Sequence, residues 1–343
     1  MKQRIAGSAG LALALLSAAT FGTSGAFATS LLEVGWTPGA AVTARVVSAA
    51  LVLTVPALLQ LRGRRASLLR SSRLLTTYGL AAVAGAQLGF FMAVQHLSVA
   101  VALLLEYSGA LLVVGWLWLR HGQRPGRLTV SGAVAAILGL GLVLNLVGNT
   151  ELDLVGVLWG LGAAVGLAVY FVLSAGTEDA LPPVVVAWGG LTIGGAALLA
   201  AGAVGVLPLQ APRTDVTLLE TEVSWLVPVL GLSLVAAVVA YVSGIVAARL
   251  LGAKVASFIG LTEVLFAVVF AWVLLGQSLG ALQLVGAALV VAGISLVRLD
   301  ELRASPPAPV LTSAEDVLAT KLPTEILAAS PSHGAVAAKA SGP

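Results

Sequence analysis

Apolar runs of about twenty residues, joined by short polar links, occupy this sequence from residue 7 to residue 298. A helix needs about 20 apolar residues to cross roughly 30 Å of hydrocarbon. Short links, such as those at Gln95 and Gln277, make successive helices antiparallel neighbours. The sequence therefore predicts an all-α membrane protein with ten transmembrane helices. The predicted spans are residues 7–30, 40–60, 76–94, 99–119, 129–147, 154–174, 184–206, 225–248, 255–275 and 279–298.

The composition supports a membrane environment. Apolar residues make up 59% of the chain and charged residues only 10%, whereas soluble domains carry about 45–50% apolar and about 25% charged residues. So few charges cannot cover a water-exposed surface, so lipid must be the solvent for much of the chain. The absence of cysteine excludes disulfides and thiolate metal sites.

Lysine and arginine are concentrated on one side of the predicted spans. If the N-terminus is cytoplasmic, the external loops contain only Arg213, and fourteen cations fall in cytoplasmic positions. These are Lys2, Arg4, Arg62, Arg64, Arg65, Arg70, Arg73, Arg120, Arg124, Arg127, Arg249, Lys254, Arg298 and Arg303. Such an excess is typical of cytoplasmic loops. We predict two cytoplasmic termini and, because Ala, Val, Leu and Gly dominate as in GC-rich bacterial genomes, a bacterial inner membrane.

The two ends of the chain need separate interpretations. Lys2 and Arg4 precede the first apolar run, and Ala26-Phe27-Ala28 resembles a signal-peptidase site. Cleavage there would leave an odd number of helices, so we expect the first run to be kept as a span. The last residues are rich in Pro, Ala and Ser, which predicts a disordered cytoplasmic tail over 301–343.

The two halves of the chain resemble each other. The matched features are the runs that begin at Glu106 and Glu263, the pairs Val101-Ala102 and Val255-Ala256, and Gly132 and Gly139 with Gly286 and Gly293. We predict a first five-helix repeat over 1–148 and a second over 149–300. Five is an odd number, so the second repeat must enter the membrane with the opposite orientation. Inverted repeats of this kind are common in secondary transporters, whose substrate sites lie between the repeats near the midplane.

The same residues carry a family resemblance. The run from Thr262 to Gln277 and the following run from Gln283 to Gly293 resemble the EamA branch of the drug/metabolite transporter superfamily. The sequence departs from that pattern at Val264, where the family usually has proline, and at Gln277, where it usually has glutamate. The run from Val99 to Gly109 is similar to threonine/homoserine exporters. The resemblance implies ten helices in two repeats and transport of amino acids, metabolites or drugs, often driven by protons.

Three ionisable residues lie deep in the predicted spans: Arg45, Glu106 and Glu263. A charged residue at a helix centre costs about 2.5–3.5 kcal/mol, so it usually faces a cavity or a partner. Glu106 is about 10 Å from the outer end of its span at 1.5 Å per residue, and Glu263 lies in the inner half. The repeat relates the two acids by a pseudo-two-fold axis. Depth would allow an Arg45–Glu106 ion pair, either in a cavity or as a purely structural link.

Our hypothesis is that both glutamates line a substrate cavity and that at least one of them titrates during transport. An amino acid would offer its ammonium to a carboxylate and its carboxylate to Arg45. The neighbouring polar residues could also bind a solute or serve as helix–helix links. These neighbours are Tyr107, Ser108, Thr262, Gln87 and Gln95, with Thr20, Thr23 and Ser24 in the first span.

Three classes of function fit a multi-helix membrane protein. A membrane enzyme would need clustered catalytic groups, whereas the acids here are isolated. A non-transporting scaffold or sensor would usually carry a signalling domain. Secondary transport accounts for the repeat and the buried acids, with amino-acid export as the first expectation and broad drug or metabolite efflux as the alternative.

The expected partners are a small-molecule substrate, the lipid bilayer and protons. His96, His121 and His333 have no metal-ligand spacing, and no cofactor motif is present. The basic loop from Arg62 to Arg73 suits anionic lipid and the orientation rule better than nucleic acid. The sequence does not predict an oligomeric state.

Overall fold

The computed structural model describes residues 2–62, 65–97, 99–143, 153–176, 181–218, 221–275 and 280–303. Residues 1–301 form one compact unit. The predicted tail beyond Arg303 lies outside the described residues, as do the link at Gln277 and the external Glu151.

The described residues of the first half contain ten helical elements. They are α1 (Lys2–Gly22), α2 (Ser24–Glu33), α3 (Pro38–Gln60), α4 (Arg65–Arg70), α5 (Ser72–Thr77), the π-helical segment η1 (Tyr78–Gly85), α6 (Ala86–Val94), α7 (Val99–Tyr107), α8 (Gly109–His121) and α9 (Arg127–Val143). Several of these are successive pieces of one longer apolar helix, as in Gly7–Glu33 and Ser72–Val94.

The second half begins with α10 (Leu154–Ala175) and α11 (Pro183–Ala203). A short antiparallel hairpin follows, made of β1 (Val216–Leu218) and β2 (Thr221–Val223), in which Val216 pairs with Val223. The remaining elements are α12 (Leu226–Leu230), the π-helical segment η2 (Gly231–Val239), α13 (Ala240–Gly260), α14 (Thr262–Leu275) and α15 (Ala281–Arg303).

Within the described residues, eight helices are long and apolar enough to span a bilayer, so the chain is a multi-pass membrane protein. Two differences separate this set from the ten predicted spans. The described part of the fifth span, Arg127–Val143, is shorter than a full crossing. The predicted eighth span and the start of the ninth form one apolar stretch, Leu226–Gly260, whose helical dihedrals are interrupted at Gly252 (φ 80°, ψ 160°). Only glycine readily adopts that conformation. The count of ten therefore remains a prediction.

The distribution of side chains is that of a protein dissolved in lipid. Large apolar residues such as Leu51, Leu119 and Leu138 are well exposed, while much of the buried core consists of alanine. Lipid solvates apolar side chains, so they gain little by burial there, and small residues instead let the helices approach closely. This pattern agrees with the composition argument made from the sequence.

Local signals set where the long helices begin. Thr37 accepts a hydrogen bond from the Ala40 N–H at the start of α3, and Pro38 occupies its first turn. Asp153 does the same for α10, because Gly156 and Val155 donate their backbone N–H groups to its carboxylate. These two hydrogen bonds hold the pKa of Asp153 below its ordinary value.

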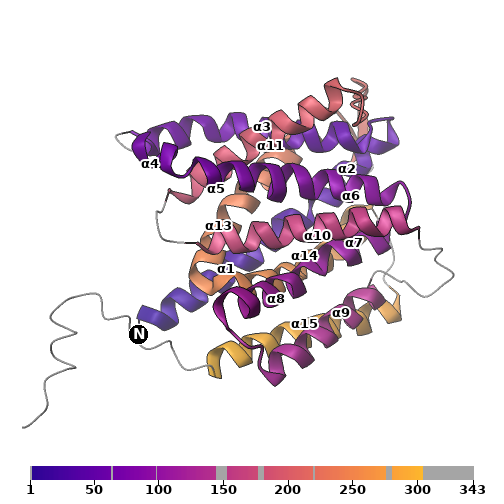
Figure 1. Cartoon of the computed structure of the whole chain (residues 1–343). Coiled ribbons are helices and arrows are strands. Elements are labelled where there is room, and N and C mark those ends of the chain that lie inside the picture. Colours follow the sequence, from indigo (N-terminus) through magenta and orange to yellow (C-terminus); the bar gives the residue numbers. More distant parts are fainter. Residues whose placement is uncertain are drawn as a thin grey trace, which may run out of the picture. The chain divides into compact units, whose positions relative to one another are not determined.

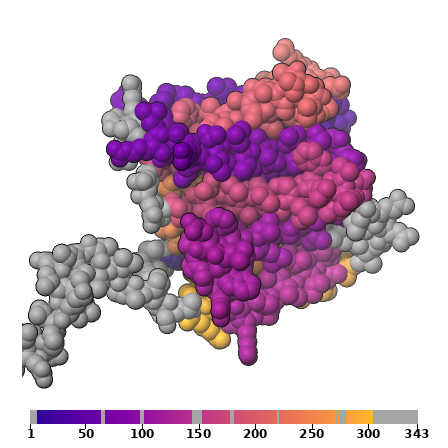
Figure 2. Space-filling view, viewed as in Figure 1, coloured from indigo at the N-terminus to yellow at the C-terminus, as the bar shows by residue number. Residues whose placement is uncertain are grey.

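The helices of the two halves pack against each other reciprocally (Figure 1). The first helix of the chain, α1, packs against α13 and α14. Its counterpart in the second half, α10, packs against η1, α6, α7 and α8. In the space-filling view, α10 lies directly against the α5–α6 region (Figure 2). The unit is therefore held together mainly by contacts between its halves.

Helices α9 and α15 cross at the matched glycines. A Cβ added at Gly132 would lie 2.6 Å from the Gly293 carbonyl oxygen, and one added at Gly139 would lie 2.6 Å from that of Gly286. Both distances are shorter than real Cβ contacts, so these positions require glycine. Residue numbers rise along α9 as they fall along α15, so the two helices run antiparallel at this crossing.

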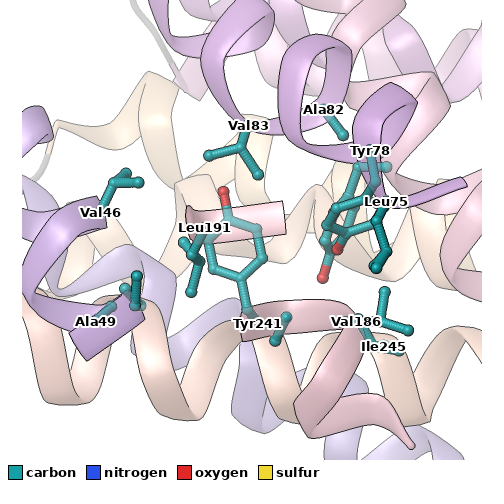
Figure 3. Close-up of a cluster of buried hydrophobic side chains, with 14 of the residues drawn as sticks. Val46, Ala49, Leu75, Tyr78, Ala82, Val83, Val186, Leu191, Tyr241 and Ile245 are labelled. Atoms are coloured by element: carbon teal, nitrogen blue, oxygen red, sulfur yellow. The ribbon is translucent and has the colours of Figure 1, made fainter. Parts of the chain in front are cut away.

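The largest buried cluster fills the space between α3, η1, α11 and α13 (Figure 3). In Figure 3, Leu191 from α11 lies between the Tyr241 ring and the α3 residues Val46 and Ala49. Tyr170, Phe171 and Tyr241 belong both to this cluster and to the wall of the cavity described next.

Candidate functional site

A cavity of about 660 Å³ lies between the two halves of the chain. Its walls come from α1 and α2, α3, η1 and α6, α7, α10, η2 and α13, and α14. At one end it reaches Leu32, Pro38 and Val94, near the ends of α2, α3 and α6. The predicted orientation assigns those helix ends to the outside of the cell.

Five of the predicted site residues line this cavity: Arg45, Gln87, Glu106, Tyr107 and Glu263. They come from α3, α6, α7 and α14, which belong to both halves. Arg45 interacts electrostatically with both glutamates, and the Tyr107 side chain interacts with Glu263. The tertiary structure thus brings together groups that are more than 200 residues apart in sequence, as Arg45 and Glu263 are.

Three predicted site residues do not line the cavity. Gln95 lies exposed at the end of α6. Ser108 and Thr262 donate their hydroxyls to carbonyls three residues earlier in the chain, Ser108 to Leu105 at 2.5 Å and Thr262 to Ile259 at 2.7 Å. Each hydroxyl satisfies a carbonyl where the helix is interrupted, so we assign these two residues a structural role in place of substrate binding.

The polar residues of the first span also differ in whether they line the cavity. Thr20 and Thr23 donate to backbone carbonyls of their own helix. Ser24 also donates to its own helix, at Phe21, but it lies in the cavity wall.

This assignment predicts the effect of two hydroxyl deletions. S108A and T262A should each lower the free energy of unfolding by about 0.5–1.5 kcal/mol, the usual net value of one such hydrogen bond. Solute exchange by the purified protein in liposomes should stay within about twofold of wild type, because neither hydroxyl faces the solute. Y107F, which removes a hydroxyl from the cavity wall, provides the contrast and should impair exchange. If well-expressed S108A loses exchange, the Ser108 hydroxyl binds solute and the structural assignment is wrong.

Arg45 is buried without a paired anion. Its side chain is only 8% exposed, and its Nε has no hydrogen-bond partner. Across the described residues no salt bridge joins it to a glutamate, so the Arg45–Glu106 ion pair allowed by depth is not formed. Instead the guanidinium lies 5.5 Å from the centroid of the Phe21 ring, a distance typical of a cation–π contact. The donors of Arg45 are therefore available to an anionic group inside the cavity.

Aromatic rings that the sequence analysis missed form part of the cavity wall. Phe21 lies 5.1 Å from Tyr241, Tyr241 lies 5.7 Å from Tyr170, and Tyr170 lies 5.9 Å from Tyr78, measured between ring centroids. Tyr78 is fully buried and accepts a hydrogen bond from Ser174 at 3.4 Å. Phe21, Tyr170 and Tyr241 of this aromatic column line the cavity.

A sequence signal for the aromatic column was present. The chain has four tyrosines, and all four lie in apolar helices. A buried tyrosine hydroxyl usually needs a polar partner. Tyr107, Tyr170 and Tyr241 line the cavity, and the Tyr78 ring packs against the Tyr170 ring. Tyrosines within spans therefore indicate the cavity, and of the four only Tyr107 was among the residues predicted from the sequence.

The comparisons with known proteins agree with this architecture. The model of the EamA-like transporter family matches residues 8–145 and again residues 154–299. A solved structure described as "Crystal structure of protein" has a TM-score of 0.68 to this chain and 20% identity, and the match covers 86% of this chain and 97% of that chain. At that identity the likeness shows the fold alone. No curated protein matches the chain. Because the family match covers most of its length in two successive copies, the chain belongs to the EamA-like transporter family.

Proposed function

We propose that this protein is a secondary active transporter that exports amino acids or related small metabolites, driven by protons. Family membership implies a small-molecule substrate and a lipid bilayer as partners. The finer resemblance of the run around Glu106 to threonine/homoserine exporters favours amino acids within that class.

The observation that carries this proposal is the charge arrangement in the cavity. Arg45, with its unpartnered Nε, and two carboxyls line the same enclosed space. An amino acid presents a carboxylate and an ammonium within a few ångströms of each other, and it fits a site that offers both signs of charge. Charge-assisted hydrogen bonds of this kind are worth about 1.5–3 kcal/mol each.

The fold supports an alternating-access mechanism between two inverted five-helix repeats, with boundaries at 1–148 and 149–300. The antiparallel crossing of α9 and α15 uses the matched glycines of both repeats. The packing of α1 against the second half is matched by the packing of α10 against the first. In such proteins one repeat rocks against the other around a fixed site. In our proposed orientation the bacterial inner membrane has both termini on its cytoplasmic side, and the cavity described here opens outward.

Counterflow in proteoliposomes tests the proposal. The purified full-length chain is loaded with unlabelled solute, and uptake of labelled threonine, homoserine and other amino acids is followed with and without a pH gradient. We expect exchange of at least one amino acid and stimulation by the gradient. The double variant E106Q/E263Q should be inactive, and E222Q, which changes an exposed acid on β2, should behave like wild type. Failure of every amino acid to exchange would contradict amino-acid export.

A second candidate is broad drug or metabolite efflux. The specific observation in its favour is the aromatic wall of Phe90, Phe91 and Phe171, which offers flat apolar surfaces to many solutes. The same liposomes distinguish the two candidates if a panel of apolar cations is added. Exchange of these cations without exchange of amino acids would favour the second candidate.

A further inference from the structure

The two halves can be aligned by one constant offset in residue number, which we call the register. The interruption after α7 falls at Ser108, and the interruption before α14 falls at Leu261, next to Thr262, the first residue of α14. The hydroxyls of Ser108 and Thr262 donate to equivalent carbonyls, three residues earlier. Ser108 and Thr262 are 154 positions apart, as are Gly132 and Gly286.

The π-helical segments follow the same register. Segment η1 covers Tyr78–Gly85, and η2 covers Gly231–Val239, which contains the positions 154 residues further on. Gly139 and Gly293 also obey this spacing. Helix geometry, hydroxyl contacts and glycine positions therefore agree on one alignment of the last three helices of each half.

In this register the two glutamates are not equivalent, contrary to the direct match made from the sequence. Glu106 corresponds to Gly260, and Glu263 corresponds to Gly109. Glu106 lies three residues before Gly109, and Glu263 lies three residues after Gly260. In each half the interruption falls between the acid and the glycine. The pseudo-two-fold axis therefore does not exchange the acids.

The two glycines explain why neither half has both acids. A Cβ at Gly109 would lie 2.6 Å from the Ala164 carbonyl oxygen, and a Cβ at Gly260 would lie 2.8 Å from the Phe171 ring. Helix α10, which contains Ala164 and Phe171, packs closely at both places. A side chain at Gly109 would have to displace the α10 backbone, and one at Gly260 would have to displace the Phe171 ring.

The helix ends give the two carboxyls different environments. Glu106 is the second-last residue of α7, inside the span Val101–His121, so it lies at no helix N-terminus that would favour its negative charge. Glu263 is in the first turn of α14, at the N–H end, where negative charge is favoured. Helical side chains lean toward the N-terminus of their own helix. Glu263 therefore leans toward its interruption, and Glu106 leans away from its own.

The other groups around the acids sharpen this difference. Glu106 interacts with Glu263 from α14 and with Arg45 from α3. Glu263 also interacts with the Tyr107 hydroxyl of α7, and the rings of Tyr170 from α10 and Tyr241 from α13 complete the surroundings. Two neighbouring carboxylates share a single cation, Arg45, so one of them gains by accepting a proton. Because Glu263 lies at a helix N-terminus, which favours its negative charge, Glu106 is the carboxyl that accepts the proton.

We propose that the two carboxyls have separate roles: Glu106 takes up and releases the coupling proton, and Glu263 stays ionised and binds the cationic group of the solute. One proton enters Glu106 from the water-filled cavity, and the same proton leaves it when the cavity faces the other side. The role of Glu263 in binding the solute rests on the proposed transport function. The role of Glu106 does not, because a protonation site can be observed without any substrate.

Infrared difference spectroscopy tests the protonation site directly. The purified full-length chain in lipid nanodiscs is titrated with pH, and the carbonyl stretching band of a protonated carboxyl is followed. We expect a titrating band in wild type and in the control E222Q, the same band at lower pH in E263Q, where Glu106 no longer shares Arg45 with a second carboxylate, and its loss in E106Q. Each variant is first checked for monodispersity and melting temperature, so that a misfolded sample is not scored. A band that survives in E106Q and disappears in E263Q, or that is absent from wild type, overturns the assignment.

Transport measurements test the division of roles. E106Q should lose the response of counterflow to a pH gradient, because glutamine cannot carry the proton, whereas the exposed control E222Q should keep both counterflow and that response. E263Q should lose counterflow by about 10- to 100-fold, the value of one charge-assisted hydrogen bond. E263D, which keeps the charge, should recover part of it. Equal losses in E106Q and E263Q contradict separate roles. If the infrared band assigns the proton to Glu106 but no solute exchanges, the transport proposal fails and the protonation site stands.

Discussion

Replacement of Arg45 by methionine should abolish amino-acid exchange while the protein stays folded with an unchanged or higher melting temperature. The Arg45 side chain is 8% exposed and its Nε has no hydrogen-bond partner. A charged residue in this environment costs about 2.5–3.5 kcal/mol on insertion scales, and methionine of similar length does not have that cost. Loss of the anion-binding group should reduce exchange by about 10- to 100-fold.

A second arginine in the bundle provides the matched control. Arg249 donates from Nη2 to the Leu181 carbonyl oxygen at 2.8 Å, so R249M removes a hydrogen bond and should lower the melting temperature. The exposed Arg213 serves as a neutral control, since R213M should change neither stability nor exchange. Thermal shift in detergent and counterflow in liposomes measure both properties. A clear drop in melting temperature for R45M would mean that Arg45 holds the fold together and does not primarily receive an anion.

Leucine at Gly139 should prevent the chain from assembling as a monodisperse protein. At this position a single added carbon would lie 2.6 Å from the Gly286 carbonyl oxygen and 2.7 Å from the Val290 nitrogen. Both are backbone atoms, so no side chain can turn away to make room. Overpacking usually costs about 1–3 kcal/mol for added methylenes in a packed core, and alanine should show a loss of that size. Leucine adds three further carbons and should separate α9 from α15.

Gly162 in α10 is the control for this prediction, because a Cβ added there meets nothing within 4 Å. Replacing glycine by alanine within a helix gains about 1 kcal/mol of helix propensity at either position, so the difference between G139A and G162A isolates the packing effect. Fluorescence-detected size exclusion and thermal shift give the comparison. Equal yields and melting temperatures for G139L and G162L would show that the α9–α15 crossing does not stabilise the fold.

The aromatic column gives the cavity a direction. Tyr170 and Tyr241 separate the space beside Arg45 from the buried Tyr78. If the protein transports a solute as proposed, the solute passes these rings, and we expect them to separate in the alternate conformation. In the proposed mechanism, rocking of one repeat against the other supplies that movement.

Much of the architecture could be predicted from the sequence because its causes are local. Whether a run of residues can cross a bilayer depends on its length and polarity, and both are properties of the run itself. The glycine spacing of seven in two segments predicted a packing face, and the structure places Gly132 and Gly139 against Gly293 and Gly286. Helix ends were less certain, since the interruption at Gly252 and the π-helical segments depend on neighbouring helices.

The site was only partly predictable for a physical reason. Polarity and depth identified Arg45, Glu106 and Glu263, because a charge in hydrocarbon is costly wherever its helix is placed. The direction of a hydroxyl or a ring depends on contacts that apolar sequence does not encode. Ser108, which the sequence left open as a solute contact or a helix link, donates its hydroxyl to the Leu105 carbonyl of its own helix.

The sequence by itself determined that this chain resides in lipid, approximately where its spans lie, and which charges are buried within them. Only the tertiary structure decided which groups share one cavity, that Arg45 has no paired anion, and that the two acids occupy inequivalent positions beside the helix interruptions. The reason is that partition into a bilayer sums over a segment, residue by residue. Charge pairing and packing depend on distances between helices that are far apart in the chain.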